Sequence, residues 1–125
     1  MGKAIHLDKA EFCRRVADVA TSPKDWKYLG DKPAVVDFFA SWCGPCRALS
    51  PVLDELAEDY DGRVYIYKVD VDAESDLAST FGVRSVPTLL FLPVGGQPRI
   101  VTGVQPADQL RKMIDAMLSA VPAKG

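Results

Sequence analysis

The sequence has little of what several common classes of protein require. Its 125 residues include three cysteines and one histidine, too few for a disulfide-bonded scaffold. A structural zinc site would need Cys13 and His6 to join the close pair Cys43 and Cys46, and no second such pair exists. No apolar run approaches the ~20 residues that cross a bilayer, and the net charge of −2 shows no basic excess. We therefore expect no metal, no membrane contact and no nucleic-acid partner.

Two further absences concern cofactors and export. The sequence contains no Gly-x-Gly-x-x-Gly and no Walker motif, so we expect no bound nucleotide cofactor. Its first residues lack the apolar core and cleavage site of a secretory leader, so we expect a cytoplasmic protein unless a leader has been removed. The composition is ordinary for a globular protein, with 48% hydrophobic and 26% charged residues. We expect a single domain over residues 1–125.

Two of the three cysteines stand three apart in the motif Trp42-Cys43-Gly44-Pro45-Cys46. The run 34–40 before the motif is apolar apart from one residue and does not alternate, which predicts a central strand buried on both faces. A helical pattern follows, so Cys43 is expected at the helix N-terminus, where amide dipoles favour its thiolate. Cys46 lies one turn further in and can resolve a mixed disulfide. The motif is therefore typical of dithiol–disulfide exchange.

Strand and helix patterns alternate along the chain and end in a hairpin. Alternation in the first half predicts a parallel sheet, and the final hairpin adds antiparallel strands, so the fold class is α/β with a mixed sheet and helices on both faces. We expect strands over 4–7, 34–40, 64–71, 88–92 and 99–102, and helices over 9–20, 47–60, 72–82 and from Pro106 along an apolar stripe that ends at Val121.

Several separated segments together resemble the thioredoxin family, over roughly Phe12 to Val121. They are Val36-Asp37-Phe38, the motif Trp42 to Cys46, Pro51 in the helix after it, Lys68-Val69-Asp70, Val86-Pro87-Thr88 and Gly103. The resemblance implies a thioredoxin fold, with a mixed five-stranded sheet flanked by four helices, and a cis Pro87 that faces Cys43.

The resemblance also implies an activity. It is that of a monomeric protein-disulfide reductase, in which Cys43 attacks from an exposed position at the helix start and the shielded Cys46 resolves. A flavin-dependent thioredoxin reductase would restore the Cys43/Cys46 dithiol with NADPH, so NADPH is used only indirectly. The substrates would be disulfide-containing proteins.

Asp37 and Lys68 are the candidate proton-transfer residues. Asp37 stands within an otherwise apolar strand, where a carboxylate is costly unless it is paired or protonated, so its pKa should be raised. It matches the family's buried acid, and we interpret it as the proton acceptor for Cys46, directly or through a water. The alternative is a hydrogen-bonded structural carboxylate. Lys68, in the adjacent strand, is its expected partner; the alternative is an exposed strand lysine.

By the same resemblance, an apolar surface for substrates should surround Cys43. Its expected members are Trp42, Val86, Pro87, Gly103 and Val104, with Gly44 and Pro45 forming the spacer between the cysteines. An extended substrate segment could pair with the backbone beside Pro87. Plain core packing is the alternative for Val86 and for Val104. The Gly-Pro spacer is similar to that of reductants.

Two other functions stay open at this point. One is an exported oxidant or isomerase on the same fold, and the other is a non-catalytic binding module that uses the surface around Trp42. The connection 21–32 is longer than is usual in the family and contains Trp26 and Tyr28. We expect it to pack against the domain, with a partner surface as the alternative. Cys13 is expected to be a buried, inert thiol.

Overall fold

A five-stranded sheet forms the centre of the protein in the computed structural model, which describes residues 3–120. The strand order is β1-β3-β2-β4-β5, with β2 (Ala34–Phe39) in the middle. β1 (Ile5–His6) pairs parallel with β3 (Tyr65–Asp70), and β3 pairs parallel with β2. β4 (Thr88–Leu92) and β5 (Arg99–Thr102) add antiparallel pairs on the other side. The predicted mixed sheet is confirmed, and β5 lies at its edge.

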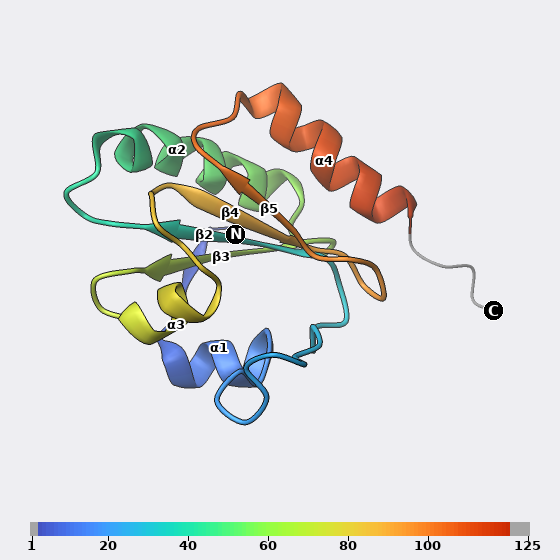
Figure 1. The fold of residues 1–125 in the computed structure, drawn as a ribbon. Helices are drawn as coiled ribbons and strands as arrows, with labels where there is room; N and C mark the ends of the chain where they lie inside the picture. Colours follow the sequence, from blue (N-terminus) through green and yellow to red (C-terminus); the bar gives the residue numbers. More distant parts are fainter. Residues whose placement is uncertain (1–2, 121–125) are drawn as a thin grey trace.

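Helices cover both faces of the sheet (Figure 1). α1 (Lys9–Arg15) and α3 (Ser75–Thr80) lie on one face, and α2 (Gly44–Asp59) and α4 (Ala107–Ser119) lie on the other. The element order β-α-β-α-β-α-β-β-α agrees with the predicted order. The fold class is therefore confirmed as α/β, with four helices around a mixed sheet.

The central strand β2 is buried on both faces, which explains its unbroken apolar run. Val36 and Phe38 belong to the core beside α1 and α3, whereas Val35 belongs to the core beside α2 and α4. Successive side chains of a strand point to opposite faces. Asp37 therefore shares the face of Val35 and lies under α2, the helix that carries the two cysteines.

The predicted bounds of α1 and α3 were wrong. α3 spans Ser75–Thr80 instead of 72–82. α1 ends at Arg15 instead of residue 20, although Val16, Ala17 and Val19 are all buried as the helical spacing suggested. The amide of Leu29 donates to the carbonyl of Val16 at 2.8 Å, so a distant loop takes the acceptor that a longer helix would have used. The apolar pattern of α2 was recognisable only from Arg47, but the helix begins at Gly44 with Cys43 as its N-cap, as the position of the motif predicted, and a proline suits the first turn.

The C-terminal helix begins one residue later than predicted. Pro106 is its N-cap and not its first helical residue. Leu110, Ile114 and Met117 of the predicted stripe are buried, and Val121 lies outside the described residues.

The long connection 21–32 packs against the domain by its aromatic residues. The ring of Trp26 meets Phe81 edge-on, with 5.3 Å between the ring centroids. The hydroxyl of Tyr28 donates to the carbonyl of Lys32, which closes the end of the connection. Both Trp26 and Tyr28 pack against the core beside α1. This agrees with the preferred interpretation of packing.

Candidate active site

The two cysteines of the motif lie where β2 passes into α2, and they are joined as a disulfide with 5.2 Å between their Cα atoms. Cys43 is the N-cap of α2, in an extended conformation. Its Sγ accepts a hydrogen bond from the amide of Cys46 at 3.2 Å. The positive end of the helix is therefore directed at the sulfur of Cys43, which is the placement that the sequence predicted.

The expected exposure of Cys43 was wrong. Cys43 is 4% exposed and Cys46 3%, so burial does not distinguish them in the disulfide form. Both pack in a small cluster with Ala40, partly covered by Val86. The carbonyl oxygen of Val86 lies 3.7 Å from the Sγ of Cys43. The expected shielding of Cys46 is confirmed, and Cys43 is covered because the segment before Pro87 lies against it.

The segments expected to surround Cys43 meet at this end of the sheet. The Val86–Pro87 peptide bond is cis, as the resemblance implied, and Pro87 is buried. The amide of Gly103 donates to the carbonyl of Pro87 at 2.9 Å, so that carbonyl is already bonded within the protein. Gly103 has a φ of +97°, a conformation that glycine adopts without strain. Val104 is 49% exposed.

Trp42 is the most exposed large apolar side chain of the described residues, at 68%. Its indole Nε1 donates to Asp72 Oδ2 at 2.9 Å. Gly44 and Pro45 are also exposed. Sequence reasoning missed Asp72, although a signal existed. Asp72 follows the end of β3, and the carboxyl ends of neighbouring parallel strands lie at the same edge of a sheet, so Asp72 had to lie near the motif that follows β2.

Asp37 is fully buried, and neither of its carboxylate oxygens has a hydrogen-bond partner among residues 3–120. Burial disfavours the charged form and raises the pKa of Asp37 to about 6, while the positive charge of Lys68 opposes this rise. The predicted direction of the pKa shift is confirmed. A carboxyl group that titrates near neutral pH, beneath the helix that carries two cysteines, has the pKa of a general acid–base group.

Lys68 lies opposite Asp37 in the register of β2 and β3, but it makes its hydrogen bond elsewhere. Its Nζ donates to Ser50 Oγ at 2.8 Å and lies 4.8 Å from the centre of the Phe39 ring. Lys68 is 7% exposed, so the alternative of an exposed strand lysine is wrong. Its influence on Asp37 is that of a nearby charge. No pattern in the sequence indicated the contact with Ser50.

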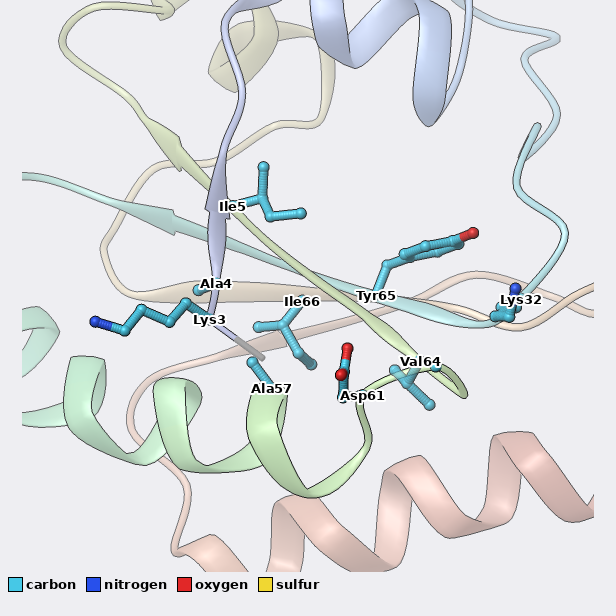
Figure 2. Close-up of a pocket in the computed structure, with 10 residues that line it drawn as sticks. Lys3, Ala4, Ile5, Lys32, Ala57, Asp61, Val64, Tyr65 and Ile66 are labelled. Carbon is cyan, nitrogen blue, oxygen red and sulfur yellow. The ribbon is translucent and has the colours of Figure 1, made fainter. Parts of the chain in front are cut away.

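Two hollows differ in their position relative to the disulfide. One of about 240 Å³ is lined by Cys46, Ser50 and Lys68 among others. A larger one, of about 430 Å³, is lined by Val64, Tyr65 and Ile66 and by the end of α2 (Figure 2). Because Tyr65 and Ile66 pair with Ala34 and Val35 at the start of β2, the larger hollow lies at the opposite end of the strands from the disulfide. The smaller hollow therefore belongs to the site.

Two features of residues 3–120 concern metals and membranes. No group of three or more His, Cys, Asp or Glu residues is arranged to hold a metal ion. Within the same residues, no helix is both long and apolar enough to cross a membrane.

Comparison with known proteins decides the family. The family model described as Thioredoxin matches residues 4–116. The chain belongs to the thioredoxin family. Among curated thioredoxins, that of Borreliella burgdorferi is 42% identical over 111 residues, which cover 89% of this chain and 94% of that protein. The chloroplastic M-type thioredoxin of Spinacia oleracea is 37% identical over 111 residues, 88% of this chain and 61% of that protein.

Solved thioredoxin structures have the same fold. A chloroplastic thioredoxin z gives a TM-score of 0.77 at 30% identity, covering 96% of this chain and 98% of its own. A mutant thioredoxin from Halobacterium salinarum NRC-1 gives 0.74 at 35% identity, covering 96% and 95%. With the thioredoxin family established and the Cys43–Cys46 disulfide in place, the chain is a protein-disulfide reductase that acts through this redox-active disulfide.

Proposed function

We propose that Cys43 is the attacking thiol and Cys46 the resolving thiol of this reductase. The observation that carries the assignment is the hydrogen bond from the Cys46 amide to Cys43 Sγ at the N-terminus of α2. The same amide and the helix dipole stabilise a thiolate on Cys43. Cys46 lies inside the first turn, where the helix end acts on it less directly.

The reaction transfers two electrons in two exchange steps. The Cys43 thiolate attacks one sulfur of a substrate disulfide, forms a mixed disulfide and releases the other substrate sulfur as a thiolate, which takes up a proton. Cys46 then loses its proton and attacks Cys43 Sγ, and the second substrate thiolate leaves. The substrate ends as a dithiol and the protein as the Cys43–Cys46 disulfide, so the substrate gains the two electrons that the protein dithiol loses.

We assign Asp37 as the base that accepts the proton of the Cys46 thiol. The carboxyl group of Asp37 is buried under α2 and titrates at a pKa of about 6, so near neutral pH it is available as a base. Lys68 acts on this carboxyl group through its charge. This assignment keeps Asp37 in the role predicted for it, whereas Lys68 acts only as a nearby charge and not as the hydrogen-bonded partner that was predicted.

The substrate surface of the proposal consists of Trp42, Gly44, Pro45 and Val104, which are exposed, together with Val86, Pro87 and Gly103 beside Cys43. Trp42 provides a large apolar face that is anchored through its indole to Asp72. An extended segment of a disulfide-containing protein would lie across this surface, with backbone pairing beside Pro87.

Recycling of the disulfide completes the proposal. A flavin-dependent thioredoxin reductase would return the Cys43–Cys46 disulfide to the dithiol with electrons from NADPH, and neither cofactor would bind to this chain. Residues 1–125 would act as one monomeric domain. A reducing compartment such as the cytoplasm suits a protein that donates electrons, because the dithiol has to be regenerated after each turnover.

The test is reduction of insulin disulfides by the wild type, Cys43→Ser and Cys46→Ser, with dithiothreitol as the electron source. We expect Cys43→Ser to lose the catalysed rate. Cys46→Ser, reduced beforehand and mixed with insulin after dithiothreitol has been removed, should accumulate a mixed disulfide, which mass spectrometry detects. Cys13→Ser is the matched control and should keep the wild-type rate. Equal rates for the wild type and Cys43→Ser would contradict the assignment.

A further inference from the structure

A polar pair between α2 and β3 lies beside the disulfide, and one of its two members, Ser50, has no part in the reaction proposed above. The Nζ atom of Lys68 donates to Ser50 Oγ at 2.8 Å, and Lys68 is 7% exposed. Ser50 follows Cys46 by four residues on α2, so the two side chains lie on the same face of the helix. The pair therefore connects the helix that carries the resolving thiol to the strand beside Asp37.

Asp37 is the expected partner of the Lys68 ammonium group, yet its carboxylate accepts no hydrogen bond from Lys68. Asp37 and Lys68 are paired in the register of β2 and β3, and paired residues of neighbouring strands project from the same face. Neither carboxylate oxygen of Asp37 accepts a hydrogen bond from Lys68 or from any other described residue. One of the three N–H donors of the ammonium group is directed at the Ser50 hydroxyl instead.

Solvation explains why the serine can compete with a carboxylate. Ser50, Lys68 and Cys46 line the hollow of about 240 Å³, which is large enough for several waters at roughly 30 Å³ each. An ammonium group at this position can keep part of its hydration. Pairing with Asp37, which is fully buried, would require the ammonium group to leave that hollow for the core, where desolvation of a charge is costly.

The other groups that face Asp37 carry no competing charge. Its register partner on β4 is Leu89, and the two cysteines at the start of α2 are joined as a disulfide and do not titrate. Among the described residues, Lys68 is the charged group that acts on the Asp37 carboxyl. A side chain that fixes the position of the Lys68 ammonium group therefore controls the electrostatic potential at Asp37.

We propose that Ser50 is a positioning residue, whose hydroxyl holds the Lys68 ammonium group away from the Asp37 carboxylate and so leaves that carboxylate free to receive the proton of Cys46. The inference rests on the proposed role of Asp37 as the base. Without the hydroxyl, the ammonium group would relax toward Asp37. A cation within 4–6 Å of a carboxylate lowers its pKa by about 1–3 units, and Asp37 would become a weaker base.

The experiment measures the titration of the Asp37 carboxyl group by ¹³C NMR in the oxidised protein, where Cys43 and Cys46 do not titrate. We expect Ser50→Ala to lower the midpoint by about one pH unit and Ser50→Thr, which keeps the hydroxyl group, to restore it. Ser41→Ala is the matched control, because Ser41 lines the same hollow and its carbonyl, not its side chain, accepts the hydrogen bond from Arg47. Its midpoint should not move.

A double-mutant cycle shows whether Ser50 acts through Lys68. Lys68→Met should raise the midpoint, since it removes the opposing charge, and adding Ser50→Ala to Lys68→Met should then change nothing further. An unchanged midpoint in Ser50→Ala, or an equal shift with and without Lys68, would overturn the proposal.

The same Ser50→Ala variant is then followed in the reaction. The pH profile for resolution of the mixed disulfide should move to lower pH, and the rate near neutral pH should fall a few-fold. The titration needs no substrate, so it tests whether Ser50 positions Lys68 even if the protein fails to reduce insulin. A midpoint that moves in the titration while the kinetic profile stays fixed would overturn the link to Cys46.

Discussion

Asp37 places an ionisable group where the hydrophobic core of the α2 face would otherwise be continuous. Its pKa of about 6 in the folded protein compares with about 3.9 for an aspartate in an unfolded chain. Below about pH 4 the group is protonated in both states and does not affect stability. Between about pH 4 and pH 6 the unfolded chain loses the proton first, so the free energy of unfolding falls as the pH rises.

This difference predicts that Asp37→Asn stabilises the oxidised protein above pH 6. The neutral amide avoids burial of a negative charge, and the pKa difference corresponds to about 3 kcal/mol, which is the largest gain expected. Urea unfolding at several pH values from 3.5 to 8 measures the effect. Asp25→Asn, at an exposed aspartate, is the control and should follow the wild type. A constant difference between wild type and Asp37→Asn across this range would mean that Asp37 does not titrate as assigned.

Single residues also show where sequence reasoning reached its limit. Cys43, Cys46 and Asp37 were predictable because their chemistry is unusual for their position in the pattern. Ser50 was not, because its hydroxyl acts only through a contact with Lys68, eighteen residues away. The exposure of Cys43 was predicted wrongly because the helix start alone suggests an open thiol, while the covering Val86 lies 43 residues away.

At the scale of elements, strands and helices whose apolar pattern reflects their burial were predicted well. The ends of helices that depend on contacts with distant residues were not. β2 was recognised because burial on both faces leaves a continuous apolar run. The end of α1 was missed because Val16 and Val19 keep the helical spacing of buried residues, although Leu29 takes the carbonyl of Val16. Local sequence carries no information on which loop will return to that carbonyl.

The connection 21–32 gives a prediction at this scale. Trp26 is half-buried against Phe81, so Trp26→Ala should lower the free energy of unfolding by about 1–3 kcal/mol, less than the 3–5 kcal/mol of a fully buried aromatic residue. Insulin reduction should stay at the wild-type rate, since the connection packs on the face of α1 and α3. Lys27→Ala, at an exposed neighbour, is the control. Unchanged stability with a weaker response to the reductase would instead favour a partner surface.

On the scale of the whole molecule, the fold brings together at one end of the sheet segments that are far apart in the chain. β2 supplies Asp37, and α2 with its N-cap supplies the two cysteines. β3 supplies Lys68, and the turn before β4 supplies Val86 and Pro87. A change in the state of the disulfide therefore acts on several elements at once. Redox state and folding stability must be linked, because the disulfide exists in the folded protein and can also persist in the unfolded chain.

This linkage predicts that the oxidised protein is more stable than the reduced protein. A disulfide that closes a loop of a few residues, with a sequence separation of 3, restricts the unfolded chain by about 2 kcal/mol. The same difference makes the disulfide about 40 mV harder to reduce in the folded protein than in the unfolded chain, since 30 mV corresponds to about 1.4 kcal/mol. Urea unfolding with and without dithiothreitol measures it. The Cys43→Ser/Cys46→Ser variant, which keeps Cys13, should not respond.

The sign of this stability difference between the oxidised and reduced protein also distinguishes a reductase from an oxidant, the alternative function that the sequence alone left open. A disulfide stabilised by the fold has a low potential, so its dithiol form donates electrons readily. If the reduced protein proved the more stable form, the fold would favour the dithiol and the disulfide would be a strong oxidant. The amide of Cys46 favours the reduced form, because it stabilises a thiolate on Cys43. The unpaired carboxylate of Asp37 acts against the reduced form, because it opposes a second negative charge nearby. We expect the loop restriction to prevail over the single amide contact, and the oxidised protein to unfold at the higher urea concentration.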